Sequence, residues 1–266
     1  MITFDYHTHH HRCGHALGTI EQYVQIALAL NLTEIGISDH APLYWQDGDH
    51  PQVGSAMARS HLAGYVEEVL AVRAKYAGRI RVRLGLECDF VEGWDEVYRE
   101  ALEPFPFDYL IGSVHYVHGQ HIYNTTRWRE CADPDSHYTE YFRLVRASAR
   151  SGLFDILGHT TGLLAYGPPP EPELLRREFS ETAAAVAETG VAVEINASGI
   201  RKGGAEPFPA GALLREYRVA GVPLTYGSDS HLPTEVGHAR DVVEPLLADA
   251  TLWRPSDSGA AIKRTA

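Results

Sequence analysis

Short apolar segments alternate with longer amphipathic segments along most of this chain. The short segments predict strands at residues 2–9, 34–38, 80–86, 109–114, 154–157, 191–195 and 222–226. The longer segments predict helices at residues 20–30, 55–76, 95–102, 136–150, 173–189, 209–220 and 234–247. Polar stretches at 42–54 and 116–135 and a glycine-containing loop at 197–207 interrupt this order. Seven strand-then-helix units without an internal sequence repeat indicate a parallel α/β sheet.

Local signals mark several of the helix ends. Thr19 and Gln22 form a capping-box pattern at the start of the first helix. Gly152 and Gly190 follow two later helices and are typical of helix stops. Pro209 fits the first turn of the helix predicted at 209–220.

Metal-ligating residue types follow six of the seven predicted strands. In Asp5-Tyr-His-Thr-His9, a strand would project His7 and His9 from one face, where two imidazoles can hold one ion. Histidine or carboxylate side chains also stand at the ends of the second, third, fourth, fifth and seventh strands. The candidate ligands are His7, His9, His15, His40, Glu87, His115, His159, Asp229 and His231.

The distribution of these ligands distinguishes between two parallel folds. In an open sheet, the carboxyl ends of six strands would lie along a line too long for one site. In a closed barrel the same ends converge on one mouth. The sequence therefore predicts a single-domain (β/α) barrel over residues 1–254, with a small, polar tail at 255–266 that we expect to be disordered.

Nine ligands are too many for one tetrahedral ion and predict two or three divalent metals, with Glu87 as a bridging carboxylate. Imidazole with carboxylate suits zinc, iron or manganese and does not choose among them. We expect Asp39, and by the same reasoning Asp5, Glu194 and Asn196, to orient ligand histidines through hydrogen bonds.

The remaining histidines receive a structural interpretation. His10 and His11 lie in the first loop and could at most exchange with neighbouring ligands. The others are expected to be surface or structural residues: His50, His61, His118, His121, His137 and His238.

Composition narrows the classes of partner. The net charge of −12 argues against nucleic acid or an anionic membrane as the main partner, so an anionic substrate would need a local positive centre such as a metal cluster. The cysteines Cys13, Cys88 and Cys131 have no zinc-ribbon spacing, and their odd number is a poor disulfide framework. With no signal-peptide pattern and no membrane-length apolar run, the sequence predicts a soluble cytoplasmic protein.

Other catalytic mechanisms lack their motifs. Gly203-Gly204 is not followed by the Lys and Ser or Thr of a phosphate-binding loop, and no Gly-x-Ser-x-Gly elbow occurs. A Cys13 or Cys88 nucleophile would lack a separate base once the histidines hold metal.

Taken together, these motifs resemble the polymerase and histidinol phosphatase (PHP) superfamily, within it the monofunctional histidinol-phosphatase branch. The resemblance covers residue 5 to about residue 240. The motifs that carry it are Asp5-Tyr-His-Thr-His9, Cys13-Gly-His15, Ser38-Asp-His40, Gly85-Leu-Glu87, Ile111-Gly-Ser-Val-His115, Ser151-Gly-Leu-Phe-Asp-Ile-Leu-Gly-His159, Glu194-Ile-Asn-Ala-Ser-Gly-Ile-Arg-Lys202 and Gly227-Ser-Asp-Ser-His231.

The resemblance implies a distorted (β/α)7 TIM-like barrel with a trinuclear metal site. Each ion would take its own set of ligands: His7, His9, Glu87 and Asp229 for the first, Glu87, His115 and His159 for the second, and His15, His40 and His231 for the third. One departure concerns the phosphate. Family members usually continue after the Gly-His of the fifth strand with Pro-Asp and basic residues, whereas this chain has Thr160-Thr161. Arg201 and Lys202 are therefore expected to bind the substrate phosphate.

The resemblance also implies hydrolysis of L-histidinol phosphate to L-histidinol and phosphate, in histidine biosynthesis. A metal-bridging hydroxide would attack phosphorus, with Glu87 and Asp229 holding the ions and Arg201 neutralising developing charge. One alternative is another PHP phosphoesterase that acts on a different small phosphate ester or a nucleotide. A second is a catalytically idle barrel that binds metal or a partner. The oligomeric state is not predicted.

Overall fold

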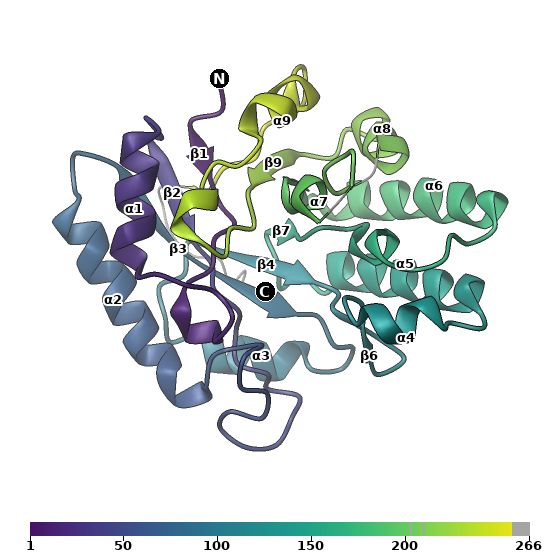
Figure 1. Ribbon diagram of the computed structural model, residues 1–266, viewed down its shortest axis with the longest axis horizontal. Coiled ribbons are helices and arrows are strands. Elements are labelled where there is room, and N and C mark those ends of the chain that lie inside the picture. Colours follow the sequence, from purple (N-terminus) through teal and green to yellow (C-terminus); the bar gives the residue numbers. More distant parts are fainter. Residues whose placement is uncertain (203, 210, 257–266) are drawn as a thin grey trace.

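A seven-stranded parallel sheet forms the centre of the molecule (Figure 1). The computed structural model describes residues 1–202, 204–209 and 211–256, with the exception of the Arg129 side chain. Along the sheet the strands are β1 (Phe4–Asp5), β2 (Glu34–Ile37), β3 (Arg81–Asp89), β4 (Tyr109–Ser113), β7 (Ile156–Leu157), β8 (Ala192–Asn196) and β9 (Leu224–Gly227). Every neighbouring pair in this order is parallel.

The sheet curls until its first and last strands meet. The Tyr6 amide donates to the Tyr226 carbonyl at 3.2 Å, the His9 amide donates to the Ser230 carbonyl at 2.9 Å, and Thr8 forms a parallel bridge with Ser230. These contacts bring β1 beside β9, so that the carboxyl ends of all seven strands surround one mouth. The α/β barrel predicted from the sequence is confirmed.

Helices cover the outside of the sheet (Figure 1). They are α1 (Ile20–Ala29), α2 (Leu62–Lys75), α3 (Asp95–Leu102), α4 (Thr125–Arg129), α5 (Pro134–Arg150), α6 (Pro172–Thr189), α7 (Ser198–Arg201), α8 (Gly211–Val219) and α9 (Arg240–Leu247). The predicted capping box is present, because the Thr19 hydroxyl accepts from the Gln22 amide and the Gln22 side chain accepts from the Thr19 amide. None of the helices in the described part of the chain is long and apolar enough to cross a membrane.

Some predicted boundaries were wrong. The helix expected from residue 55 begins at Leu62. It is preceded by a 3₁₀ turn at Arg59–His61, in which the Ser60 amide and hydroxyl donate to the Asp49 carboxylate. Pro209 lies before α8 rather than in its first turn. The helix expected at 234–247 is divided into a 3₁₀ turn (Pro233–Glu235) and α9, with left-handed backbone at Gly237 and Ala239 between them.

The two irregular stretches near the mouth also contain short elements. Residues 116–135 include a hairpin of β5 (Tyr116–Val117) and β6 (Gln120–His121), followed by α4. The loop at 197–207 begins with α7, which carries Arg201 at its end. Glu87 lies within β3 rather than after it, since the strand continues to Asp89.

Tyr109 of β4 fills the barrel interior against two glycines. Its hydroxyl donates to the Tyr6 carbonyl at 2.6 Å. A Cβ atom built on Gly36 would lie 1.9 Å from the Tyr109 hydroxyl, and one on Gly85 would lie 2.3 Å from the ring. The strands therefore accommodate this large side chain only where β2 and β3 have no side chains of their own.

Gly36→Ala is expected to destabilise the protein by about 1–3 kcal/mol, the usual cost of overpacking a core. The added methyl must displace a buried tyrosine that is also hydrogen-bonded to Tyr6. Chemical denaturation measures the change in the free energy of unfolding. Gly64→Ala, in α2, is the control. Outside the helix backbone, the one described atom within 4 Å of its Cβ would be Arg12 Nη2 at 3.9 Å, and alanine favours a helix. Equal stabilities of the two variants would contradict this view of the barrel interior.

The opposite end of the barrel holds the start of the predicted tail. Arg83 pairs with Glu34 and donates to the Pro255 and Ser256 carbonyls, both at 3.3 Å. Residues 257–266 lie outside the described residues, and the division of the chain at residue 254 stays a prediction.

Candidate metal centre

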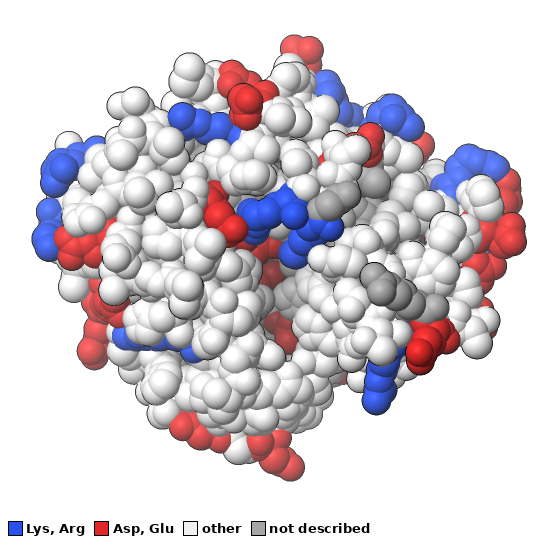
Figure 2. Space-filling view, viewed as in Figure 1, with Lys and Arg blue, Asp and Glu red and all other residues white. Residues whose placement is uncertain are grey.

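A cavity of about 600 Å³ opens at the carboxyl ends of the strands. Figure 2 looks into this hollow, with basic side chains at one rim and acidic atoms deeper inside. Seven of the nine predicted ligands line it: His15, His40, Glu87, His115, His159, Asp229 and His231. The other two, His7 and His9, are buried beneath and contact Asp229. The barrel thus gathers all nine candidates in one place.

One group of ligands comes from the ends of β1 and β9. The atoms His9 Nε2 and Asp229 Oδ1 lie 3.1 Å apart, and His7 Nε2 lies 3.8 Å from the same oxygen. These three side chains can hold one ion together. Glu87 lies next to them, with Oε2 3.4 Å from His7 Nε2.

A second group lies at the ends of β3, β4 and β7. His159 Nε2 is 3.1 Å from Glu87 Oε1 and 3.1 Å from His115 Nε2. Glu87 therefore faces this group with one oxygen and the first group with the other. This is the placement that a bridging carboxylate requires.

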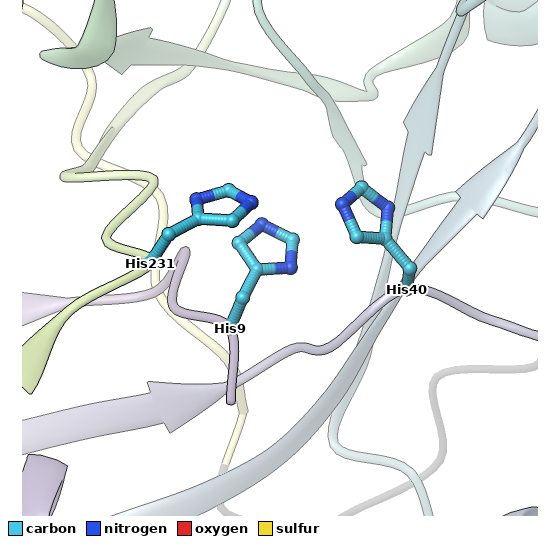
Figure 3. A group of neighbouring side chains, drawn as sticks. All are labelled: His9, His40 and His231. Carbon is cyan, nitrogen blue, oxygen red and sulfur yellow. The ribbon is translucent and has the colours of Figure 1, made fainter. Parts of the chain in front are cut away.

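The third group contains His15, His231 and His40. His15 Nε2 and His231 Nε2 lie 3.0 Å apart. Figure 3 shows His40 and His231 directed toward His9, with ring centroids 4.3 and 4.2 Å from its ring. His40 Nδ1 lies 2.9 Å from Glu87 Oε2, so His40 stands between the groups.

Hydrogen bonds fix the orientation of three ligand rings through their Nδ1 atoms. His7 Nδ1 bonds to Glu194 Oε2 at 2.8 Å, His115 Nδ1 bonds to Asp89, and His231 Nδ1 bonds to the Asp229 carbonyl at 3.1 Å. Each acceptor takes the proton on Nδ1, so in the neutral form of these rings the lone pair lies on Nε2. These histidines thus present to the cavity the nitrogen that a metal would bind.

The donor set fits divalent metal ions. Within the described residues, His7 Nε2, His9 Nε2 and Glu87 Oε2 are buried without a hydrogen-bond partner. The Nε2 pairs at 3.0 and 3.1 Å resemble the spacing of about 3.3 Å between two nitrogens bound tetrahedrally to one zinc ion. Buried polar atoms without partners are costly unless a ligand satisfies them.

Electrostatics favour the same interpretation. Burial alone would raise the pKa of Glu87, but the charges of His40 and His7 outweigh it and hold that pKa well below its usual range. The pKa of Asp229 is also held well below its usual range, by Lys202 and His7 against the effect of burial. Both carboxylates are therefore ionised at neutral pH.

Two of the ligand histidines are held in the neutral form. Burial and the charge of His40 lower the pKa of His15 to about 4. Burial and the charge of His9 lower the pKa of His231 to about 2. At neutral pH their nitrogen lone pairs are available to a cation.

Buried carboxylates behind the ligands hold the site together. Asp39 Oδ1 lies 3.4 Å from His9 Nδ1, and Asp39 Oδ2 lies 2.7 Å from His10 Nδ1. Glu194 Oε1 accepts hydrogen bonds from the His159 amide and from Asn196. In contrast, Asp5 accepts from backbone amides at Ser228 and Gly237 and contacts no ligand imidazole in the described residues. From the sequence we expected Asp39, Glu194, Asn196 and Asp5 to orient ligand histidines. Asp5 instead anchors the loop that carries Asp229.

Arg201 and Lys202 stand at the rim of the cavity. Arg201 donates to the carbonyls of Ser228 and Asp229, at 3.2 and 2.6 Å, and its Nε lies 3.3 Å from Glu235 Oε1. Lys202 Nζ lies 3.4 Å from Asp229 Oδ2 and 4.4 Å from the centre of the Tyr123 ring. Among the described residues that line the cavity, these two carry the Lys and Arg side chains.

Several lining residues were not predicted. His121, expected to be a surface or structural residue, stacks on His115 with 5.6 Å between ring centroids. Tyr116, Tyr123 and Asp89 also line the cavity. The sequence pattern gave little indication of their position. Tyr116, His121 and Tyr123 lie in the polar stretch 116–135, which has no periodicity to show which side chains face the cavity. The position of Asp89, two residues after Glu87 on β3, could have indicated it.

The thiols next to the ligands are unsuited to nucleophilic attack. Cys13 and Cys88 are free and buried. Burial raises the pKa of both thiols, with a further contribution from Asp39 at Cys13 and from Asp89 at Cys88. Because the thiolate is the reactive form, neither cysteine competes with a metal mechanism.

The fold and the site define a parallel α/β barrel whose mouth carries a histidine- and carboxylate-rich centre suited to several metal ions. The model of the PHP domain family matches residues 5–198. A Deinococcus radiodurans protein named "Probable histidinol-phosphatase" is 38% identical over 237 residues, which cover 88% of each chain. This chain belongs to the PHP domain family, as the sequence motifs predicted.

Other relatives extend the comparison. The histidinol-phosphatase of Bacillus subtilis is 28% identical over 259 residues, covering 88% of this chain and 96% of that protein. The crystal structure of histidinol phosphate phosphatase from Lactococcus lactis, complexed with zinc, L-histidinol and phosphate, has a TM-score of 0.74 at 22% identity. It covers 92% of this chain and 93% of that chain, and at this identity the likeness concerns the fold.

Proposed function

We propose that this protein is a metal-dependent phosphomonoesterase that hydrolyses L-histidinol phosphate to L-histidinol and phosphate. The observation that carries the proposal is the convergence of the nine candidate ligands on one cavity with Arg201 and Lys202 at its rim. The relatives in Deinococcus radiodurans and Bacillus subtilis support the substrate. Zinc is supported by the Lactococcus lactis complex, with iron and manganese as alternatives for the same donors.

The residues of this chain have separate roles in the proposal. His7, His9, Glu87 and Asp229 would hold one ion, Glu87, His115 and His159 a second, and His15, His40 and His231 a third. Bound divalent metals supply Lewis acidity toward phosphate oxygens and lower the pKa of water. Glu87 and Asp229 would contribute the negative charge that keeps these cations together. Arg201 and Lys202 would bind the phosphate, while Glu194 and Asp89 keep ligand rings in place.

The test is a phosphate-release assay combined with elemental analysis of protein never exposed to chelator. We expect two or three transition metals per chain, release of phosphate from L-histidinol phosphate, and loss of activity after chelation that returns when metal is restored. A protein that contains no metal as purified would exclude the mechanism. Metal-containing protein that hydrolyses nucleotides or other small esters instead would favour the first alternative, and metal-containing protein without hydrolysis would favour the idle barrel. The absence of a nucleic-acid partner and the cytoplasmic location stay predictions from the sequence.

A further inference from the structure

Three rings that the metal centre does not use form one side of the cavity. Tyr116 and His121, from the β5–β6 hairpin, and Tyr123, just after it, are called here the aromatic wall. The His121 ring lies 5.0 Å from the Tyr116 ring and 5.8 Å from the Tyr123 ring, between centroids. All three side chains are partly exposed to the cavity they line.

The aromatic wall is held in a fixed position. The Tyr116 hydroxyl donates to Gln52 Oε1 at 2.7 Å, which joins the hairpin to the loop after β2. His121 is nearly parallel to the ring of His115, with 5° between the planes. The Tyr123 amide donates to His121 Nδ1 at 3.3 Å, so the His121 proton lies on Nε2. Rings ordered in this way can bind a ligand without losing much conformational freedom.

The charges of the cavity are separated along this wall. At the Tyr123 end, Lys202 Nζ lies over the ring, and Arg201 directly precedes Lys202 in the chain. At the His121 end, the ring stacks on His115, whose Nδ1 is bonded to the Asp89 carboxylate. Asp89 also lines the cavity. The cavity is therefore basic at the side of Arg201 and Lys202, where a phosphate would bind. Its other side combines the Asp89 carboxylate with the faces of aromatic rings.

We propose that the aromatic wall, with Asp89 beside it, binds the leaving group of the substrate and selects a cationic amino alcohol that carries a planar ring. Aromatic faces attract both a flat ring and a positive charge. Asp89 adds attraction for an ammonium group. This inference rests on the proposed function, and it makes His121 and Tyr116 specificity-determining residues for that reaction.

The experiment uses metal-loaded protein and three esters: L-histidinol phosphate, 2-aminopropyl phosphate, which lacks the ring, and propyl phosphate, which lacks the ring and the amine. We expect kcat/KM of the wild type to decrease in that order. His121→Ala should lower kcat/KM for L-histidinol phosphate about tenfold, mainly through KM, as expected for a lost ring contact. The value for propyl phosphate should change less than twofold.

Two further variants separate recognition from folding. His121→Phe keeps a ring at the same place and should retain most of the preference for L-histidinol phosphate. His118→Asn is the matched control, because His118 is exposed in the turn of the same hairpin and asparagine tolerates its positive φ of 48°. It should leave all three kcat/KM values unchanged. Equal losses for all three esters in His121→Ala, or no loss for any, would overturn the inference.

Binding of the product gives a measurement that does not need hydrolysis. Calorimetric titration should show that L-histidinol binds the metal-loaded protein more tightly than 2-aminopropanol does, and that His121→Ala abolishes the difference. If the wild type binds L-histidinol in this way but releases no phosphate, the proposed function fails, whereas recognition of the ring-bearing amino alcohol by the aromatic wall is supported. If phosphate is released but wild type and His121→Ala bind the two alcohols alike, the inference fails and the proposed function stands.

Discussion

Glu87→Gln is expected to lower kcat/KM for L-histidinol phosphate by more than 100-fold and to reduce the metal content of the protein. Glu87 faces two groups of ligands, with Oε1 3.1 Å from His159 Nε2 and Oε2 3.4 Å from His7 Nε2. Glutamine keeps the shape but removes the charge that offsets two cations. Replacing even a residue that only orients a ligand typically costs about 10- to 100-fold, and loss of a shared ligand should cost more.

Glu87→Gln should weaken the binding of more than one metal ion. The Ser113 hydroxyl donates to Glu87 Oε1 at 2.6 Å, which fixes the carboxylate at the end of β3. The charges of His40 and His7 outweigh the effect of burial and keep the pKa of Glu87 low, so the group is charged throughout the neutral range. A glutamine amide would leave histidine nitrogens in both groups without their shared anionic partner. Elemental analysis and phosphate release are the measurements.

Glu67→Gln provides the same chemical change at an exposed position of α2. His118→Ala, on the exposed turn of the hairpin, is a second control outside the ligand set. Both should retain wild-type metal content and activity. If Glu87→Gln resembled these controls, the assignment of Glu87 as a bridging ligand would be wrong.

Arg201→Ala is expected to lower kcat/KM by the amount that corresponds to a loss of about 2–4 kcal/mol of transition-state stabilisation. This is the range found when one oxyanion-binding donor is removed. Arg201 already uses three donor nitrogens on the Ser228 and Asp229 carbonyls and on Glu235. A guanidinium has five N–H groups, so one remains on each terminal nitrogen for a bidentate contact with phosphate. Its fixed position means that little conformational freedom is lost on binding.

Metal content separates this role from a structural one. In Arg201→Ala the metal content should stay unchanged while activity falls. Arg201→Lys keeps the charge but lacks the planar fork and should recover only part of the activity. If Arg201→Ala lost metal or thermal stability together with its activity, Arg201 would only support the loop that carries Asp229.

Arg127→Ala tests the other predicted source of positive charge. Arg127 is exposed on α4, and the Arg129 side chain lies outside the described residues. Wild-type kcat/KM in Arg201→Ala, together with a large loss in Arg127→Ala or Arg129→Ala, would move the phosphate site to the loop after β4.

The sequence alone determined the barrel and the position of the ligands. Strands and helices have different periods, so the alternation of short apolar and longer amphipathic segments is visible locally. Parallel strands place their carboxyl ends on one side. His115 and His159, each two residues after the end of β4 or β7, therefore had to share a mouth with His7 and His9. Two helix ends were predicted especially well, and both are marked by a local cap. Thr19 caps the start of α1, and Gly190 caps the end of α6.

Only the tertiary structure decided how the loops complete the site. His121 reaches His115 because the β5–β6 hairpin turns back over the cavity, and Gln52 meets Tyr116 from a loop 64 residues away. His40 likewise lies toward Glu87 and His9 as well as toward His231. Such contacts depend on packing between segments that are distant in the sequence, and the polar stretches that carry them have no periodicity to define a direction. The sequence therefore predicts residues at strand ends, whereas the positions of loop residues follow from the folded chain.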